Sequence, residues 1–317
     1  MNPEPVPLRL RFRRLRRRLT FLALRTMVRA LGFERLRSAG ALIGELQFRF
    51  AAASRRRLQR EVATLLGRRQ DDADVRRLLL HAYRCNTAAV LEILAMFDRR
   101  QDQALLLSSA EVEGIDRLKD ALAGGRGAIL LAGHMGNGAL FVVQLIAAGF
   151  PVTVVHKEAR MMDAGFFSKG MPLYGIEGIL ANEGIKAYSR MLGALRAGRV
   201  VYVMADQGTK RAEDGVMLRF LGKQMPMPGG PAQLARHSRA PVLPVSTVAS
   251  EPRWRFRIEP PVPLEKGATL EADVEQLVRV TELQVLAHPE LWSWPHRRWR
   301  LYPLDHRPPP GASPPAA

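Results

Sequence analysis

Residues 124–148 read GGRGAILLAGHMGNGALFVVQLIAA, and their pattern indicates the class of fold. Its first glycines lead into Ala128–Ala132 (AILLA), a short apolar run with the character of a buried strand. Leu140–Ala148 reads as the helix that follows. His134 lies between the two, at the carboxyl end of the predicted strand. A strand, a polar residue and a helix in this order indicate an α/β sheet whose sites lie at the carboxyl ends of its strands.

Strand-like runs and helical patterns alternate as far as about residue 290. The runs predict three more buried strands and an alternating edge strand: Pro151–His156, Arg199–Ala205, Ala240–Val248 and Arg253–Pro260. Helices are predicted at Ile185–Arg196, 231–239 and about Leu270–Ala287. We therefore expect an α/β fold, in which residues 124–306 form a single domain with a central, mostly parallel mixed sheet flanked by helices.

A helical region precedes this sheet. From Leu19 to about Phe97, apolar residues recur three or four positions apart, and we assign residues 19–123 to a helical N-terminal region. Residues 1–18 are expected to be a basic disordered tail, and residues 307–317 a disordered proline-rich tail.

The chain is strongly basic, with a net charge of +18 from 48 Lys and Arg against 30 Asp and Glu. Such a surplus attracts polyanions, among them nucleic acid, anionic lipid headgroups and acidic protein partners. The basic residues gather near the N-terminus, where residues 9–18 (RLRFRRLRRR) hold seven arginines. No nucleic-acid-binding motif accompanies them, so a nucleic-acid partner is not expected.

Leu19–Leu31 is apolar but is interrupted by Arg25 and Arg29. The interruptions disfavour both a secretory signal and a membrane-spanning helix, which needs about 20 mostly apolar residues. Two interpretations stay open. The segment is an amphipathic helix that associates with an anionic membrane surface, or it packs on the domain with a solvated basic face.

Cys85 is the only cysteine, which excludes an internal disulfide and a cysteine-based metal cluster. It falls within a helical apolar pattern and is expected to be an inert core thiol.

Polar residues follow two of the predicted strands directly. His134 follows the first, and Asp206 and Gln207 follow Arg199–Ala205. A carboxylate can fix the tautomer of an imidazole and stabilise its protonated form, so His134 and Asp206 are candidate catalytic residues. The alternatives are a structural histidine and an aspartate that caps a helix or turn. Asn137 and Gln207 are candidates for binding the substrate.

Six blocks of sequence carry a resemblance to a known family. In chain order they are Gly133–Asn137, Ala205–Gly208, Phe220–Gly222, Gly229–Arg236, Ala240–Val245 and His288–Trp299. Together they resemble the bacterial late (lauroyl/myristoyl) lipid A acyltransferases, a family of the lysophospholipid acyltransferase superfamily. The similarity runs from about Leu19 to His306.

The resemblance implies an acyltransferase at the cytoplasmic face of the bacterial inner membrane. It would move a fatty acyl chain from acyl carrier protein or coenzyme A to a hydroxyl of a glycolipid or phospholipid precursor similar to lipid A. The histidine would be the general base, and backbone amides near Gly136 or Gly208 would stabilise the oxyanion. Membrane lipids and the thioester carrier are the expected partners. No metal or cofactor is expected besides the thioester co-substrate, and an apolar tunnel should open beside His134.

The sequence departs from the family at one decisive position. The family has an acid five residues after the histidine, to orient the imidazole, whereas this chain has Ala139. Three interpretations stay open. Asp206, or Glu158, supplies the acid; His134 works without one, held by a carbonyl or by Asn137; or catalysis is lost and the protein is a membrane-binding scaffold.

Two pairs of cationic residues follow strands of the predicted sheet. The resemblance implies that Lys157 and Arg160 hold the phosphate or sugar headgroup of the acceptor. Lys210 and Arg211 would serve the acceptor or the pantetheine phosphate of the acyl carrier. The alternative in both cases is a solvated basic loop.

Three tryptophans, Trp292, Trp294 and Trp299, lie near Arg297 and Arg298 at the C-terminal end. Such a cluster fits a membrane-surface edge, or equally a tail that packs onto the domain.

Overall fold

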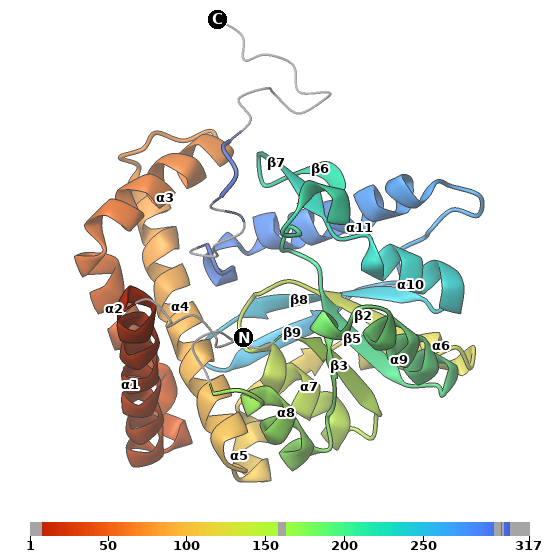
Figure 1. The fold of residues 1–317 in the computed structure, drawn as a ribbon, viewed down its shortest axis with the longest axis horizontal. Helices are drawn as coiled ribbons and strands as arrows, with labels where there is room; N and C mark the ends of the chain where they lie inside the picture. The colour runs from red at the N-terminus through yellow and green to blue at the C-terminus, as the bar shows by residue number, and fades with distance from the viewer. Residues whose placement is uncertain (1–7, 158–162, 295–298, 300, 305–317) are drawn as a thin grey trace, which may run out of the picture.

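The structure is a computed structural model and describes residues 8–157, 163–294, 299 and 301–304 (Figure 1). Its centre is a seven-stranded sheet in the order β1-β9-β8-β2-β5-β3-β4. The strands are β1 (Ala110–Glu113), β2 (Ala128–Ala132), β3 (Val152–His156), β4 (Glu177–Leu180), β5 (Val200–Met204), β8 (Val242–Ala249) and β9 (Trp254–Ile258). Strands β8, β2, β5, β3 and β4 are parallel, while β9 and β1 run in the opposite direction. A separate hairpin joins β6 (Val216–Phe220) and β7 (Lys223–Met227).

The described helices form two groups. The N-terminal group is α1 (Leu8–Leu31), α2 (Phe33–Phe50), α3 (Ala52–Leu65) and α4 (Ala73–Asp98). The others accompany the sheet: α5 (Gln103–Ser108), α6 (Ile115–Ala123), α7 (Gly138–Ala147), α8 (Phe166–Gly170), α9 (Ile185–Arg196), α10 (Gly230–Ser238) and α11 (Leu270–Ala287). Helix α7 packs on one face of the sheet, and α10 and α11 cover the other (Figure 1).

The N-terminal helices form a layer beside the sheet, with α4 on its inner side (Figure 1). Helix α2 lies very close to α4 because it presents two glycines one turn apart. A Cβ at Gly40 would lie 2.4 Å from the Cα of Ala88, and one at Gly44 would lie 2.3 Å from the carbonyl oxygen of Tyr83. Any side chain at these positions would separate the two helices.

Strand β2 lies at the centre of the sheet and is buried along its whole length. It pairs with β5 on one side and β8 on the other. Such a strand exposes neither face nor edge to water, and this explains its unbroken apolar sequence. The parallel pairing also brings the carboxyl ends of β2 and β5 to the same edge of the sheet.

The fold class is confirmed, and β2 and α11 have the predicted bounds. Three expectations differ from the structure. Residues 8–18 were expected to be disordered but lie in α1. The sheet begins before residue 124, since β1 belongs to it, and β9 is not an edge strand because β1 covers it. Strand β4 and the β6–β7 hairpin were not predicted. The place of β1 in the sheet depends on pairing with the distant β9, which periodicity does not report.

Candidate active site

Strand register places His134 beside Asp206. Ala132 of β2 is paired with Met204 of β5, and the next residue of β5 continues the ladder with a hydrogen bond from the Ala205 amide to the Ala132 carbonyl (3.0 Å). His134 lies two residues after Ala132, and Asp206 lies two residues after Met204. The two side chains therefore leave the sheet at the same edge and at the same level.

The carboxylate of Asp206 binds the histidine at two points. Its Oδ1 lies 2.7 Å from Nδ1 of His134, and its Oδ2 accepts the backbone N–H of His134 at 2.8 Å. A carboxylate at Nδ1 favours the tautomer with the proton on that nitrogen. Nε2 is then the nitrogen that can accept a proton. The His134 side chain is 37% exposed, whereas Asp206 is buried.

Burial alone would raise the pKa of Asp206, but its neighbours reverse the shift. The charge of His134, the hydrogen bonds from its ring and backbone, and a hydrogen bond from Trp292 all favour the ionised carboxylate. They hold the pKa of Asp206 at about 2, against an ordinary value of 3.8. The carboxylate is therefore charged at neutral pH and able to stabilise a protonated imidazole.

Trp292 completes this arrangement and was not recognised as a site residue from the sequence. Its indole N–H donates to Oδ2 of Asp206 at 2.8 Å. Residues 133–137, between β2 and α7, form a loop that we call the histidine loop. The segment that carries Trp292 is tied to this loop, since the Ser293 amide donates to the His134 carbonyl (3.1 Å). Trp292, Trp294 and Trp299 are buried and pack edge to face, with ring centroids 4.8–5.8 Å apart. Of the two interpretations of these tryptophans, the structure shows packing onto the domain; Arg297 and Arg298 lie outside the described residues.

Gln207 lies against the imidazole. Its Nε2 is 2.8 Å from Nε2 of His134 and 3.1 Å from Nδ1. Because a donor in the ring plane cannot be so close to both ring nitrogens, the amide lies over the face of the ring. The structure thus brings Gln207, a candidate substrate-binding residue, into contact with the candidate catalytic residue His134.

Asn137 lies below the site and is fully buried. Its Oδ1 accepts the Leu140 amide at 3.0 Å, so it caps α7, and its Nδ2 donates to Glu92 at 2.9 Å. The backbone amide of Gly136, a candidate oxyanion donor, donates to the Leu291 carbonyl at 3.3 Å. Both groups are thus engaged within the fold.

Tyr202 lies against Gly138, the residue before Ala139. A Cβ at Gly138 would lie 2.7 Å from the Tyr202 hydroxyl oxygen, so this tyrosine of β5 occupies the space that a side chain would need. Burial, and then the charge of Asp206, raises the pKa of Tyr202. Ala139 packs against the hydrophobic core.

The cationic candidates lie around the same edge of the sheet. Lys157 is exposed directly after β3, the neighbour of β5. Lys210 and Arg211 are exposed in the segment after β5, and Arg211 pairs with Glu213 and Asp214, each at 3.1 Å. Arg160 and Glu158 lie outside the described residues.

Two cavities formed by described residues lie away from the histidine. One is lined by residues of α2, α4 and the β8–β9 turn, among them Cys85. The other is lined by Gln144 and by apolar residues of α5, β1, α6 and α7. His134 lines neither of them, so neither is the apolar tunnel expected beside it. Cys85 is buried, and burial raises its pKa to about 11, as expected of an inert thiol.

The structure is an α/β fold with a contact between His134 and Asp206 at the carboxyl edge of its sheet. Comparisons with known proteins identify the family of this chain. The family model for bacterial lipid A biosynthesis acyltransferases matches residues 8–301. A phosphatidylinositol mannoside acyltransferase of Mycobacterium tuberculosis is 28% identical over 192 residues, which span 59% of this chain and 59% of that protein. The enzyme of the same name from Mycolicibacterium smegmatis is 26% identical over 254 residues, or 79% of this chain and 81% of the relative.

The chain belongs to the bacterial lipid A biosynthesis acyltransferase family, as its sequence blocks indicated. The family match begins at residue 8, so it includes the N-terminal helices as well as the sheet.

Proposed function

We propose that the protein transfers a fatty acyl chain from an acyl thioester to a hydroxyl group of a glycolipid or phospholipid. The observation that carries the proposal is the contact of 2.7 Å between Nδ1 of His134 and Oδ1 of Asp206. Asp206, two residues beyond the end of β5, provides the carboxylate that Ala139 lacks. This contact favours the first of the three interpretations, an active enzyme with a relocated acid, over a histidine without an acid and over an inactive scaffold.

In this mechanism Nε2 of His134 takes the proton of the acceptor hydroxyl as its oxygen attacks the thioester carbonyl carbon. The carbonyl π electrons move to oxygen and form a tetrahedral oxyanion. When the carbonyl re-forms, the carbon–sulfur bond breaks, and the imidazolium gives its proton to the leaving thiolate. Asp206 stays ionised throughout and stabilises the imidazolium, as the acid of a serine-protease triad does. His134 is then ready for another cycle.

The acceptor we propose is a glycolipid. The family description names lipid A, and the two mycobacterial relatives are named for phosphatidylinositol mannoside; both are glycolipids. Acyl carrier protein or coenzyme A would supply the chain. Lys157 and Lys210 are exposed on segments that follow β3 and β5, where they could bind the phosphate of either substrate.

The test is an acyl-transfer assay in mixed micelles with labelled acyl-coenzyme A or acyl carrier protein and a panel of glycolipid acceptors. His134→Ala should lower the rate at least about 100-fold, since a general base contributes at least that factor. His237→Ala is the matched control, because this histidine lies on α10 and contacts Tyr188 instead. Transfer that survives in His134→Ala would refute the mechanism. Transfer by neither the wild type nor the variants would favour the scaffold.

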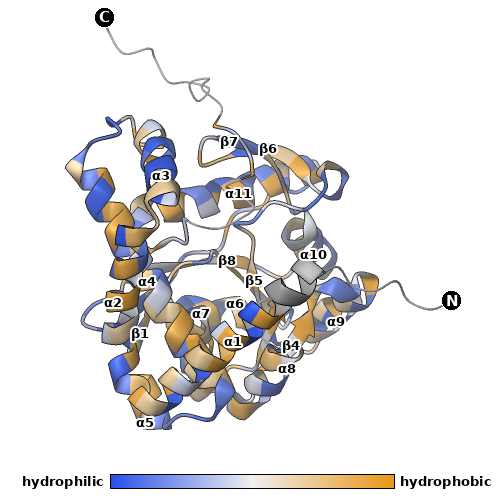
Figure 2. Ribbon diagram, turned by 60° about the vertical axis from the view of Figure 1, so that its left-hand side comes forward, coloured by the Kyte–Doolittle hydropathy of each residue, from blue (hydrophilic) through white to orange (hydrophobic). Residues whose placement is uncertain are grey.

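We further propose that α1 and α2 contact the inner membrane from its cytoplasmic side. On α1, Phe21 and Val28 are buried, while a second apolar stripe is exposed: Leu15, Leu19 and Leu22 at 54–58%. On α2, three more large apolar residues are exposed: Leu42, Leu46 and Phe50. Hydrophilic residues interleave with apolar ones along these helices (Figure 2). Exposed leucines beside arginines suit an anionic lipid surface. No helix of the described residues is long and apolar enough to cross a membrane.

Flotation with vesicles tests this contact. The wild type should float with vesicles that contain phosphatidylglycerol and less with pure phosphatidylcholine. The double variant Leu19→Gln/Leu22→Gln should lose most of the binding. Leu283→Gln on α11, also an exposed leucine (51%), should bind as the wild type does. Equal binding by all three proteins would contradict the assignment.

A further inference from the structure

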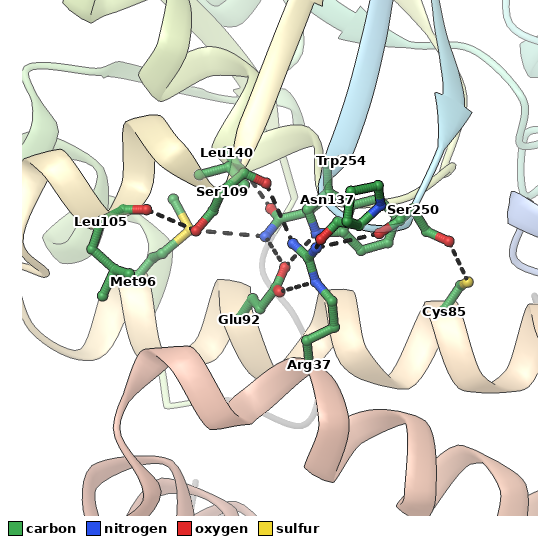
Figure 3. Close-up of polar contacts among 11 residues, drawn as sticks. Arg37, Cys85, Glu92, Met96, Leu105, Ser109, Asn137, Leu140, Ser250 and Trp254 are labelled. Atoms are coloured by element: carbon green, nitrogen blue, oxygen red, sulfur yellow. Dashed lines mark hydrogen bonds and ion pairs between the residues drawn. The ribbon is translucent and has the colours of Figure 1, made fainter.

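A buried carboxylate lies beneath the histidine loop and has no part in the mechanism above. Glu92, in the C-terminal half of α4, is 1% exposed. Three side chains from other segments donate to it (Figure 3): Arg37 Nε at 3.1 Å, Asn137 Nδ2 at 2.9 Å and Trp254 Nε1 at 2.6 Å. A buried charge with this many donors is costly to assemble and costly to disturb.

Asn137 connects Glu92 to the first turn of α7. One end of its amide accepts the Leu140 backbone N–H, and the other end donates to Glu92. The carboxylate accepts only from the NH2 end, so it fixes which way the amide points. A flipped amide would lose the cap and place its oxygen against the carboxylate. Glu92 thereby fixes the end of the loop that begins at Gly133.

Trp254 supports the middle of the same loop. Gly136 has a φ of +59°, and a Cβ there would lie 2.8 Å from Cγ2 of Thr247 and 2.9 Å from Cζ3 of Trp254. The loop therefore lies directly on the indole ring. Because the indole N–H donates to Glu92, the carboxylate that orients Asn137 also orients the surface on which the loop packs.

Arg37 supplies the positive charge and brings α2 into the cluster. Its side chain, 23% exposed, pairs with Glu92 and donates to the Pro252 carbonyl at 3.0 Å. Arg37 and Glu92 together join the N-terminal helices to the turn before β9, to β9 itself and to the loop after β2. Figure 3 shows these side chains converging between α2, α4 and the sheet.

We propose that Glu92, charge-paired with Arg37, is a positioning residue that holds the histidine loop through Asn137 and Trp254. The proposal rests on the proposed role of His134 as the base. Glu92 contacts neither the imidazole nor Asp206 in any described hydrogen bond; it acts by keeping the backbone from Gly133 to Leu140 in one conformation.

The test uses Glu92→Gln and a matched control. Glutamine keeps one acceptor oxygen and presents NH2 to at least one of the three donors. Asp273→Asn changes another buried carboxylate (side chain 3% exposed) that pairs with an arginine Nε, but this pair joins α10 and α11. Amide hydrogen exchange is read at His134, whose N–H donates to Asp206, and at Leu140, whose N–H is capped by Asn137.

Exchange at both amides should accelerate about tenfold or more in Glu92→Gln, as expected for the loss of a hydrogen bond to a charged group. In Asp273→Asn it should stay within about twofold of the wild type. Unchanged exchange in Glu92→Gln, or equal acceleration in both variants, would overturn the proposal. If Glu92→Gln does not fold, Arg37→Gln replaces it. That variant keeps two donors on Glu92 and should accelerate the same two amides by a smaller factor; no acceleration would equally overturn the proposal.

Kinetics supply a second readout. A loosened loop should lower kcat about tenfold in Glu92→Gln and leave KM within about twofold, since the substrate-binding groups are unchanged. A rise in KM at constant kcat would contradict a positioning role. If the wild type itself transfers no acyl chain, the proposed function fails, whereas the exchange experiment still decides whether Glu92 holds the loop.

Discussion

Replacing Asp206 by asparagine keeps the shape of the side chain and removes its charge. In the wild type Oδ2 accepts two donors, the His134 backbone N–H and the Trp292 indole N–H, each at 2.8 Å. Oδ1 accepts one, the His134 ring at 2.7 Å. The amide oxygen should therefore take the place of Oδ2, and the NH2 group should face Nδ1. Nδ1 then becomes an acceptor, and the ring proton moves to Nε2, where it blocks the base.

The expected loss is large. The wrong tautomer and the missing charge together should lower kcat about 10³- to 10⁴-fold, as for the orienting acid of a catalytic triad. This corresponds to about 4–5.5 kcal/mol of transition-state stabilisation. KM should change little, because Asp206 is buried and its side chain is not available to bind the substrate.

Initial rates with saturating labelled thioester in mixed micelles measure this effect, and the unfolding temperature of the variant shows that it remains folded. If folded Asp206→Asn retains more than about a tenth of the wild-type kcat, Asp206 does not orient the base. The conclusion that Asp206 takes the place of the acid missing at Ala139 would then be wrong.

Three further predictions follow from the same geometry. Gly136→Ala should lower the free energy of unfolding, measured in urea, by about 1–3 kcal/mol, because Gly136 has a positive φ and a Cβ there would lie too close to Thr247. Gly149→Ala is the control: Gly149 also has a positive φ, but a Cβ there would have nothing within 4 Å, so the free energy of unfolding should fall by less. Ala139→Glu should not raise kcat in the acyl-transfer assay, since Asp206 already occupies the Nδ1 side of the histidine; a clear increase would show that the site lacks an acid. The stability advantage of the wild type over Asp206→Asn, measured by thermal unfolding, should be fully present above about pH 4. It should shrink by about 2 kcal/mol as the pH falls through the pKa of Asp206 at about 2; a difference that does not vary with pH would contradict the lowered pKa.

Much of the fold could be predicted because its central strands are continuous apolar runs. Residues 128–132 of β2 and 200–203 of β5 are buried, and their apolar sequences show it directly. Strand β1 has no such signature, with the sequence AEVE and one buried residue. Its place in the sheet comes from pairing with β9, which follows it by more than 140 residues. For the same reason β9 looked like an edge strand in the sequence but is covered in the fold.

The candidate site, too, could be predicted from the sequence only in part. His134 and Asp206 could be singled out because each follows a strand, and strands of an α/β sheet carry sites at their carboxyl ends. Nothing in the sequence pairs β2 with β5, because two other strands lie between them along the chain. Trp292 and Glu92 could not be found by this reasoning, since an indole and a carboxylate within apolar patterns resemble any other core or surface residue.

The fold class could be read from the sequence because burial of strands and helices leaves a local periodic signal. The sequence blocks indicated the family, and the ends of the predicted strands indicated His134 and Asp206. The tertiary structure alone decided which carboxylate contacts His134, since register across the sheet sets that distance. It also decided that the C-terminal tryptophans are packed in the core and that a carboxylate of α4 lies under the histidine loop. These relations join segments far apart in the chain, and only the folded backbone brings them together.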